Sequence, residues 1–269
     1  MVGFWYKLIN PLKLLLGEGN RMFCHLVGNP EVNSQVGVIL PTYCEVQNIE
    51  KIIGEIQRLP LSTAILVIDD SSPDGTADLV KRLQPQFPNV LLMVRPKKQG
   101  LGTAITDGFR AFLSLENVPA YVVTMDADYS HNPQDIPRLV SNLQGNCDLV
   151  IGSRYCRGGK TQGWPFARKL VSRGANGLAR SLLGLEPRDC TSGFRCYSTA
   201  FLQNIVGYLH SHTYDIQIET INQAHTKGFK VEETPILFVN RKEGKSKLTL
   251  LEIKSYLSYI LKTLTPKLK

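Results

Sequence analysis

Two aspartates, Asp126 and Asp128, are the residues of this sequence best suited to carry chemistry. They directly follow an apolar run at 121–125, which is typical of a buried strand. Since a single residue separates them, both carboxylates can face one hard divalent cation such as Mg²⁺ or Mn²⁺. A cation held there can bridge the phosphates of a nucleoside diphosphate and neutralise the leaving group. The alternative is a polar turn at a strand end, because short acidic pairs are common.

Two more polar clusters follow apolar runs in the same way. Residues 41–45 (P-T-Y-C-E) end the run at 36–40, and residues 69–74 (D-D-S-S-P-D) end the run at 64–68. Ligands of mainly parallel sheets bind at the carboxyl ends of the strands, so we expect the three clusters to surround one site. Acidic side chains there can hydrogen-bond a base and a ribose. The alternative for the second cluster is an ordinary turn with a helix N-cap.

A basic stretch lies between 149 and 185, where the chain has no Asp or Glu. Guanidinium groups suit phosphate recognition, and the stretch follows the last strand of the first half. The alternative is a solvated basic face, which is the usual role of a charge run. The basic residues of the stretch are Arg154, Arg157, Lys160, Arg168, Lys169, Arg173 and Arg180.

The elements that must position these residues alternate along the chain. Apolar runs predict strands at 36–40, 64–68, 90–94, 121–125 and 148–151. Helical spacing of apolar residues predicts helices at 49–59, 77–83, 103–115 and 135–143. This alternation indicates an α/β fold with a mixed, mainly parallel sheet and helices on both faces. Beyond it we expect an extended segment at 229–239 and helices within 164–183 and at 199–206, 215–227 and 248–264.

Size and composition agree with one folded enzyme-sized domain. The chain has 269 residues, 43% of them hydrophobic, and a net charge of +8 that indicates an acidic partner such as a phosphorylated substrate, an anionic membrane or nucleic acid. The six cysteines show no C-x-x-C pair and no zinc spacing, so we expect reduced thiols. We predict an N-terminal extension that could lie near a membrane (1–35), a catalytic domain (36–247) and a C-terminal amphipathic helix with its tail (248–269).

The sequence predicts membrane contact without a membrane span. No stretch reaches the roughly 18 to 20 apolar residues that cross a bilayer. The apolar segment 4–16 lacks the cleavage site of a secretory signal and offers one surface patch. The C-terminal helix offers a second patch, and the alternative is that its stripe packs on the domain. The stripe consists of Leu250, Ile253, Leu257, Ile260 and Leu264.

Six motifs taken together resemble family 2 glycosyltransferases, in particular the dolichyl- or polyprenyl-phosphate mannose synthase branch. They are P-T-Y-C-E, D-D-S-S-P-D-G-T, G-L-G-T-A, M-D-A-D-Y-S-H-N-P, G-S-R-Y and S-G-F-R, and the similarity runs from about 36 to 247. The resemblance implies the GT-A fold, Mg²⁺ or Mn²⁺, a GDP-mannose donor and a polyprenyl phosphate acceptor. It also implies a peripheral enzyme at the cytoplasmic face of a membrane, with a small membrane-protein partner as a further possibility.

The resemblance assigns roles by position in the motifs. Donor contacts fall on Pro41, Tyr43, Glu45, Asp70, Asp126 and Asp128, and the last two also hold the metal. Acceptor phosphate contacts fall on Arg154, Arg168, Arg173, Arg241 and Lys247. Asp128 and Arg154 are expected to be catalytic, together with Asp189 if a base is used. The chain has Ser130 where some members of the family have a glutamine, which removes a candidate third side-chain ligand of the metal.

Three other functions are compatible with parts of the sequence. A polyprenyl-phosphate glucosyl- or GlcNAc-transferase would use a UDP-sugar, but its members often carry C-terminal transmembrane helices. A processive polysaccharide synthase would carry Q-x-x-R-W, which is missing. A non-catalytic basic domain that binds membranes or nucleic acid would not need three acidic clusters at one edge of a sheet. We therefore expect no nucleic acid partner.

Overall fold

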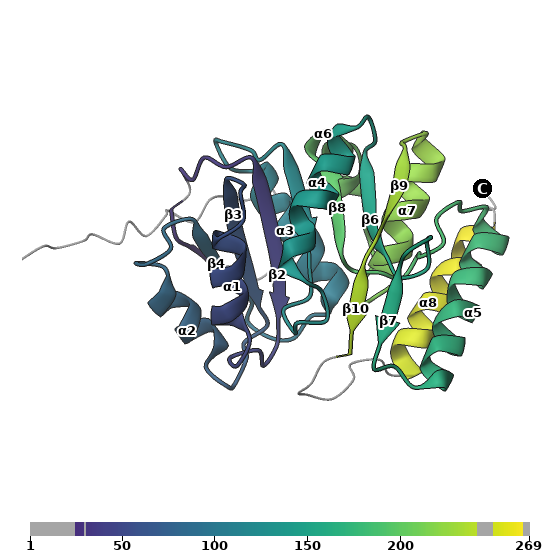
Figure 1. Cartoon of the computed structure of the whole chain (residues 1–269), viewed down its shortest axis with the longest axis horizontal. Coiled ribbons are helices and arrows are strands. Elements are labelled where there is room, and N and C mark those ends of the chain that lie inside the picture. The colour runs from purple at the N-terminus through teal and green to yellow at the C-terminus, as the bar shows by residue number, and fades with distance from the viewer. Residues whose placement is uncertain (1–24, 30, 241–249, 266–269) are drawn as a thin grey trace, which may run out of the picture.

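The computed structural model describes residues 25–29, 31–240 and 250–265. Within them, an eight-stranded sheet has the order β1-β4-β3-β2-β5-β8-β6-β9, and a small second sheet pairs β7 with β10 (Figure 1). The strands of the large sheet are β1 (His25–Val27), β2 (Val36–Thr42), β3 (Thr63–Asp69), β4 (Val90–Val94), β5 (Tyr121–Thr124), β6 (Leu149–Ser153), β8 (Arg195–Ser198) and β9 (Val231–Pro235). The small sheet consists of β7 (Lys160–Gln162) and β10 (Leu237–Val239).

Helices cover both faces of the large sheet, as the sequence predicts. The run that forms β2 is apolar throughout because the strand is buried on both faces. Ile39 packs into the core on one face, and Val38 and Leu40 pack into the core on the other. One face carries α1 (Ile49–Gln57), α2 (Thr76–Leu83) and α4 (Ile136–Gln144). The other carries α3 (Leu101–Leu113), α5 (Phe166–Leu183), α6 (Thr199–Ile205), α7 (Ile216–Lys227) and α8 (Leu250–Leu264).

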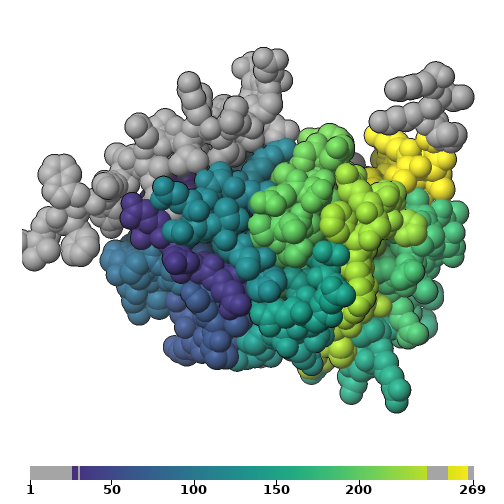
Figure 2. Space-filling view, turned by 90° about the horizontal axis from the view of Figure 1, so that it is seen from above, coloured from purple at the N-terminus to yellow at the C-terminus, as the bar shows by residue number. Residues whose placement is uncertain are grey.

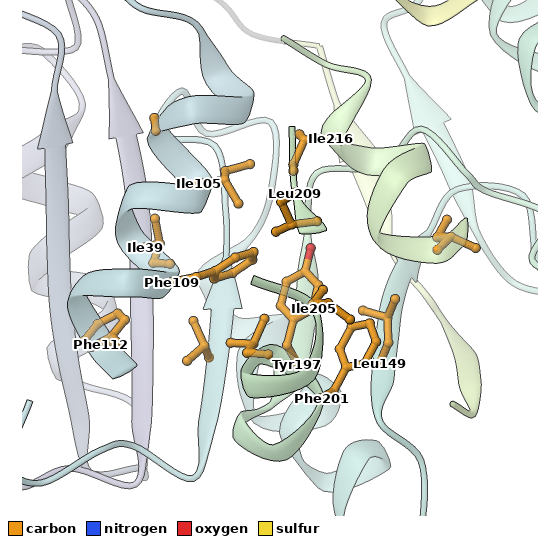
Figure 3. Packing of buried hydrophobic residues seen from close by; sticks show 14 of the residues in the cluster. Ile39, Ile105, Phe109, Phe112, Leu149, Tyr197, Phe201, Ile205, Leu209 and Ile216 are labelled. Atoms are coloured by element: carbon orange, nitrogen blue, oxygen red, sulfur yellow. The ribbon is translucent and has the colours of Figure 1, made fainter. Parts of the chain in front are cut away.

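The core between the sheet and the helices α3, α5, α6, α7 and α8 is built on aromatic side chains from α3, β8 and α6. Phe109 meets the edge of Tyr197 with the ring centroids 5.0 Å apart, and Phe201 stacks on the same tyrosine (Figure 3). Helix α3 approaches β2 closely because Gly108 has no side chain, and a Cβ there would lie 2.8 Å from Ile39 Cδ1. The glycine downstream of G-L-G-T-A is therefore explained by helix–sheet packing.

Strand β8 is one of three strands that the sequence did not predict, together with β1 and β7. It lies between β5 and β6 and runs antiparallel to both, whereas β2, β3, β4 and β5 are mutually parallel and β6 is parallel to β9. Its four residues, Arg195–Ser198, are too few to show a periodic pattern. A mixed, mainly parallel sheet is the result.

Both ends of the chain contribute to the fold. Strand β1 comes from the segment expected to be an extension and pairs antiparallel with β4, so that β1 forms the edge of the sheet. Helix α8 lies beside α5, and the hydroxyl of Tyr256 donates to the carbonyl of Ala175 at 2.9 Å (Figure 1). In Figure 2, α8 (yellow) lies at the end of the molecule opposite the blue atoms of the N-terminal half.

The residues expected to form one apolar stripe on α8 differ in their exposure to solvent. Ile260 is buried beside Tyr256, whereas Leu257 and Leu264 are exposed together with Leu261. The side chains of Leu250 and Ile253 and the segment 4–16 lie outside the described residues. Within the described residues, no helix is long and apolar enough to cross a membrane. Cysteines 44, 147, 156, 190 and 196 are free thiols.

Candidate active site

The three predicted polar clusters lie at one edge of the large sheet. Thr42 ends β2 and pairs in register with Asp69 at the end of β3. Strand β5 ends at Thr124 and β6 at Ser153, both at the edge where the antiparallel β8 begins with Arg195. The segment before β8 therefore meets the acidic pair after β5 and the G-S-R-Y motif after β6.

Asp70 is held rigidly at the end of β3. Its Oδ1 accepts from Nε of Arg95 at 2.5 Å, and its Oδ2 accepts from the backbone N–H of Gln99 at 3.2 Å. Arg95 is completely buried and also contacts Asp107 at 3.3 Å. Sequence analysis missed Arg95, because a single arginine after an apolar run has no distinctive spacing.

The residues after β2 lie beside this aspartate. Pro41 and Tyr43 flank Thr42, whose carbonyl accepts from the N–H of Asp70 at 3.2 Å. The ammonium of Lys98 lies 4.5 Å from the centroid of the Tyr43 ring. Glu45 is buried, and its carboxylate accepts from the side-chain amide of Asn48 at 3.0 Å. The predicted nucleoside contacts are thus brought together.

A tight turn directs the carboxylates of the acidic pair. Tyr129 has a φ of +60°, a left-handed conformation that few non-glycine residues adopt, and its hydroxyl donates to Glu55 at 3.0 Å. Asp128 is buried, and its Oδ1 accepts from the N–H of Ser130 at 3.0 Å. Asp126 is more open, with 35% of its side chain exposed.

His131 supports this turn. It is buried, stacks on Phe194 with the centroids 5.1 Å apart, and meets Phe238 edge to face. Its Nδ1 accepts from the backbone N–H of Asp126 at 3.2 Å. Burial lowers the pKa of His131 against the opposing effect of the Asp126 carboxylate. This position favours a structural histidine over a catalytic base.

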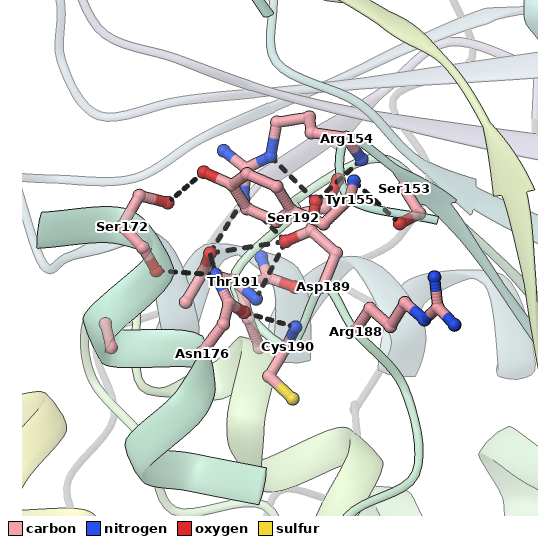
Figure 4. A network of polar contacts seen from close by, with 12 residues as sticks. Ser153, Arg154, Tyr155, Ser172, Asn176, Arg188, Asp189, Cys190, Thr191 and Ser192 are labelled. Atoms are coloured by element: carbon pink, nitrogen blue, oxygen red, sulfur yellow. Dashed lines mark hydrogen bonds and ion pairs between the residues drawn. The ribbon is translucent and has the colours of Figure 1, made fainter. Parts of the chain in front are cut away.

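Arg154 and Asp189 form a buried ion pair beside the acidic cluster (Figure 4). Nε and Nη2 of Arg154 donate to the two carboxylate oxygens at 2.8 and 2.6 Å, and its backbone N–H donates to Oδ2 at 2.9 Å. Thr191 adds a contact of 2.7 Å to the guanidinium. Such a bidentate pair fixes the direction of the arginine.

The surroundings of Asp189 favour a positioning role over the base role expected from the sequence. The carboxylate is completely buried and both of its oxygens accept hydrogen bonds. Burial alone would raise the pKa of Asp189, but the charge of Arg154 holds it below its usual range. A general base must reach the proton that it removes, and Asp189 lines neither of the two cavities described below.

The main cavity has a volume of about 350 Å³ and combines charged and apolar walls. Asp126, Arg154 and Arg168 line it on the polar side. Trp164 contributes an aromatic wall and meets Phe238 of β10 edge to face at 5.2 Å. The apolar side comes from α5 and α8, with Val171, Ala175, Leu178, Tyr256 and Leu257. This lining suits a ligand with an anionic head and an apolar tail.

The predicted acceptor arginines do not all share this cavity. Arg168 lines it, lies 4.2 Å from the Trp164 ring centroid and donates to Asn240 at 3.0 Å. Arg173 instead lines a second cavity, to which Arg154 also belongs. Arg241 and Lys247 lie outside the described residues. Ser172, which sequence analysis missed, lines the main cavity and lies between Arg168 and Arg173 along α5.

Gln217 of α7 is a further residue that the sequence did not single out. Its side chain is buried at the main cavity, and neither atom of its amide has a hydrogen-bond partner among the described residues. A Cβ on Gly193 would lie 3.4 Å from Nε2 of Gln217 and 3.7 Å from Oδ1 of Asp126. The absence of a side chain at Gly193 therefore leaves space between the amide and the carboxylate.

The backbone of Gln217 is fixed although its amide is unpaired. Nη1 of Arg195, from the S-G-F-R motif, donates to the Gln217 carbonyl at 2.6 Å and to the Thr220 hydroxyl at 2.7 Å. An unpaired buried polar group costs about 1–3 kcal/mol and calls for an explanation, and a ligand in the main cavity would supply one. A glutamine on an amphipathic helix looks like a solvent-facing residue, so only the fold reveals it.

The acidic pair fits a divalent cation. The open carboxylate of Asp126 faces the space over Gly193, and carboxylate oxygens are hard ligands. Within the described residues, no three His, Cys, Asp or Glu side chains gather as a metal cluster. A cation would therefore be held by Asp126 and Asp128 together with oxygens of a ligand or of water, which agrees with the loss of a third side-chain ligand at Ser130.

Comparisons with known proteins agree with this geometry. The model of the family "Glycosyl transferase family 2" matches residues 37–206. The chain is 40% identical over 214 residues to the polyprenol monophosphomannose synthase of Mycolicibacterium smegmatis, covering 79% of this chain and 80% of the relative. It is 37% identical over 216 residues to the undecaprenyl-phosphate mannosyltransferase of Micrococcus luteus, covering 80% and 88%.

Solved structures share the fold at lower identity. A glucosyl-3-phosphoglycerate synthase from Mycobacterium tuberculosis, in complex with Mn²⁺, UDP and its product, aligns with a TM-score of 0.59 at 20% identity, covering 87% of this chain and 80% of that chain. A mannosyltransferase from Pyrobaculum calidifontis, in complex with GDP-mannose and Mn²⁺, aligns at 0.57 and 15%, covering 93% and 69%. The GT-A fold expected from the sequence is confirmed.

Proposed function

The chain belongs to glycosyl transferase family 2, and we propose that it transfers mannose from GDP-mannose to a polyprenyl phosphate with inversion of the anomeric carbon. The main cavity carries this proposal. Its arginines are complementary to the charged head of a lipid phosphate, and its apolar wall is complementary to the lipid tail. The names of the two bacterial relatives support both the sugar and the lipid.

The residues divide between donor and acceptor. Pro41, Tyr43, Glu45 and Asp70 bind the nucleoside at the ends of β2 and β3. Asp126 and Asp128 would hold a Mg²⁺ or Mn²⁺ ion, which would neutralise charge on the leaving diphosphate. Gln217 faces the sugar or the phosphate in the space over Gly193.

The acceptor needs positioning more than activation. A phosphate monoester has its second pKa near 6, so it is largely anionic at neutral pH and serves as a nucleophile without a base. Arg154 and Arg168 orient its oxygens, and Asp189 keeps the Arg154 guanidinium in place. This arrangement accounts for a site in which arginines position the acceptor and the acidic pair serves the metal.

The enzyme attaches peripherally at the cytoplasmic face of a membrane in this proposal, and the surface formed by α5 and α8 supports contact with a bilayer. Phe166 and Leu170 of α5 are 79% and 62% exposed, and Leu261 of α8 is 63% exposed. Apolar helical surfaces with neighbouring basic residues bind bilayer interfaces. A small membrane protein that covers this surface is the alternative means of recruitment, and flotation of the purified protein with lipid vesicles distinguishes the two.

The function is tested with purified protein, labelled sugar nucleotides and a short polyprenyl phosphate. We expect mannosyl transfer from GDP-mannose in the presence of Mg²⁺ or Mn²⁺, little transfer from UDP-glucose, and competition by GDP but not by UDP. The product should carry the β anomer if the donor is the α anomer. Preferential transfer from a UDP-sugar would contradict the mannose proposal and favour a glucosyl- or GlcNAc-transferase.

Replacing Gln217 with leucine should make the protein more stable and less active. Removal of the unpaired amide should raise the free energy of unfolding of the ligand-free protein by about 1–3 kcal/mol. Loss of the ligand contact should lower kcat/KM by about five- to a hundredfold. Thermal melting and steady-state kinetics measure the two effects. Gln223→Leu on the same helix is the matched control, and equal kinetic losses in both variants would contradict a ligand contact.

A further inference from the structure

The second cavity is a basic pocket that shares only Arg154 with the main cavity. It has a volume of about 340 Å³ and lies between α5 and the segment before β8. Arg154, Arg173, Arg180 and Arg188 line it, and no Asp or Glu does. These four arginines define what we call the arginine pocket.

Only one of the four charges is neutralised within the described residues. Arg154 is paired with Asp189, whereas Arg173, Arg180 and Arg188 are exposed and make no ion pair with any described carboxylate. The carboxylate of Glu233 accepts the backbone N–H groups of Arg188 and Asp189, both at 2.9 Å. In Figure 4, the Arg188 side chain makes no dashed contact with the residues drawn.

The neutral residues of the pocket leave the arginines as its open donors. The amide nitrogen of Asn176 donates to the Ser172 carbonyl and to Thr191, and its oxygen accepts the N–H of Cys190 at 2.6 Å. Like charges that converge in a concave site focus a positive potential and attract an anion. Planar guanidinium groups match phosphate oxygens through paired hydrogen bonds.

We propose that the arginine pocket binds a phosphate group, separately from the acceptor phosphate of the main cavity. Two sources offer this chemistry, an anionic phospholipid headgroup and a free phosphate ion. The position of the pocket favours the headgroup, because Arg173 and Arg180 lie on α5, the helix that also exposes Phe166 and Leu170. A lipid bound there would hold α5 at the bilayer while the main cavity receives the acceptor.

The test compares vesicle binding by a pocket variant and a matched control of the full chain. The variant is Arg180→Gln with Arg188→Gln, which leaves the proposed acceptor contacts unchanged. The control, Lys51→Gln with Arg82→Gln, removes the same charge from exposed positions on α1 and α2, at the opposite end of the molecule (Figure 1). All four residues are exposed, so melting temperatures should stay near that of the wild type.

With phosphatidylcholine vesicles that contain phosphatidylglycerol, the pocket variant should bind about tenfold or more weakly than the control. With phosphatidylcholine alone, the two should bind equally. In a second arm without vesicles, inorganic phosphate is titrated by calorimetry. If the control gives heat with phosphate and the pocket variant gives none, while both bind anionic vesicles equally, the pocket binds the free ion instead of the headgroup.

The proposal is overturned if the pocket variant equals the control in both arms, or if the wild type shows neither interaction. Mannosyl transfer to a short acceptor in detergent serves as a separate readout, and the pocket variant should retain wild-type turnover there. Failure of the wild type to transfer mannose would contradict the proposed function, but it would leave the vesicle and phosphate results to decide on the pocket.

Discussion

Asp128→Asn is expected to lower kcat by about a thousandfold or more while the melting temperature stays within a few degrees of the wild type. A neutral amide is a poorer ligand for a hard cation, and charge neutralisation by a bound metal contributes several kcal/mol to a transition state. The fold should survive because the amide oxygen can still accept from the N–H of Ser130, as Asp128 Oδ1 does at 3.0 Å. Turnover at saturating Mg²⁺ or Mn²⁺ and the affinity for Mn²⁺ are the two measurements.

A surface carboxylate provides the control for this variant. Asp78→Asn on α2 removes an equal charge from an exposed ion pair with Lys81 and should change neither quantity. Full turnover in Asp128→Asn, or loss of turnover with unchanged Mn²⁺ affinity, would contradict the assignment of Asp128 to the metal.

The second large effect concerns the buried ion pair. Asp189→Asn should lower the free energy of unfolding by about 3–5 kcal/mol, because it leaves the Arg154 guanidinium buried without a counter-charge. The same change should weaken use of the lipid phosphate about tenfold or more while the KM for the donor changes little. Denaturant unfolding and kinetics with each substrate varied in turn measure these effects.

A double variant separates the contribution to stability from the contribution to activity. Arg154→Met with Asp189→Leu replaces the pair with apolar side chains and should recover most of the lost stability. Acceptor use should remain low, because the guanidinium is then missing. A positioning role for Asp189 predicts a raised acceptor KM in Asp189→Asn, whereas a base role predicts a lowered kcat at saturating acceptor with the KM unchanged. The second pattern would restore Asp189 as the base.

The lowered pKa of Asp189 determines the pH range over which the ion pair stabilises the fold. Because Arg154 holds the folded-state pKa below the unfolded value, the stabilisation is complete above the unfolded value and is lost as the pH falls through the folded one. The wild type should therefore lose stability in acid more steeply than Asp189→Asn, which has no carboxylate to protonate at this position.

Much of the fold follows from local pattern. The strands β2, β3, β4, β5 and β6 are short apolar runs, and each was predicted to within about two residues, because a strand buried on both faces must be apolar throughout. The polar clusters after β2, β3 and β5 follow from the same pattern, since parallel strands bring their carboxyl ends to one edge. Sequence alone thus located the acidic pair and the residues that we propose to bind the nucleoside.

Tertiary structure decided what depends on contacts between distant segments. The pairing of Arg154 with Asp189 joins residues 35 positions apart, and it depends on β8 lying antiparallel beside β6. The approach of Gln217 to Asp126 likewise requires α7 to pack over Gly193. The division of the arginines between two cavities follows from the two sides of α5, and the split stripe of α8 follows from how it packs on that helix. Spacing along a chain determines which side chains share a strand or a helix face, whereas the packing of the elements determines which charges meet and which face remains exposed.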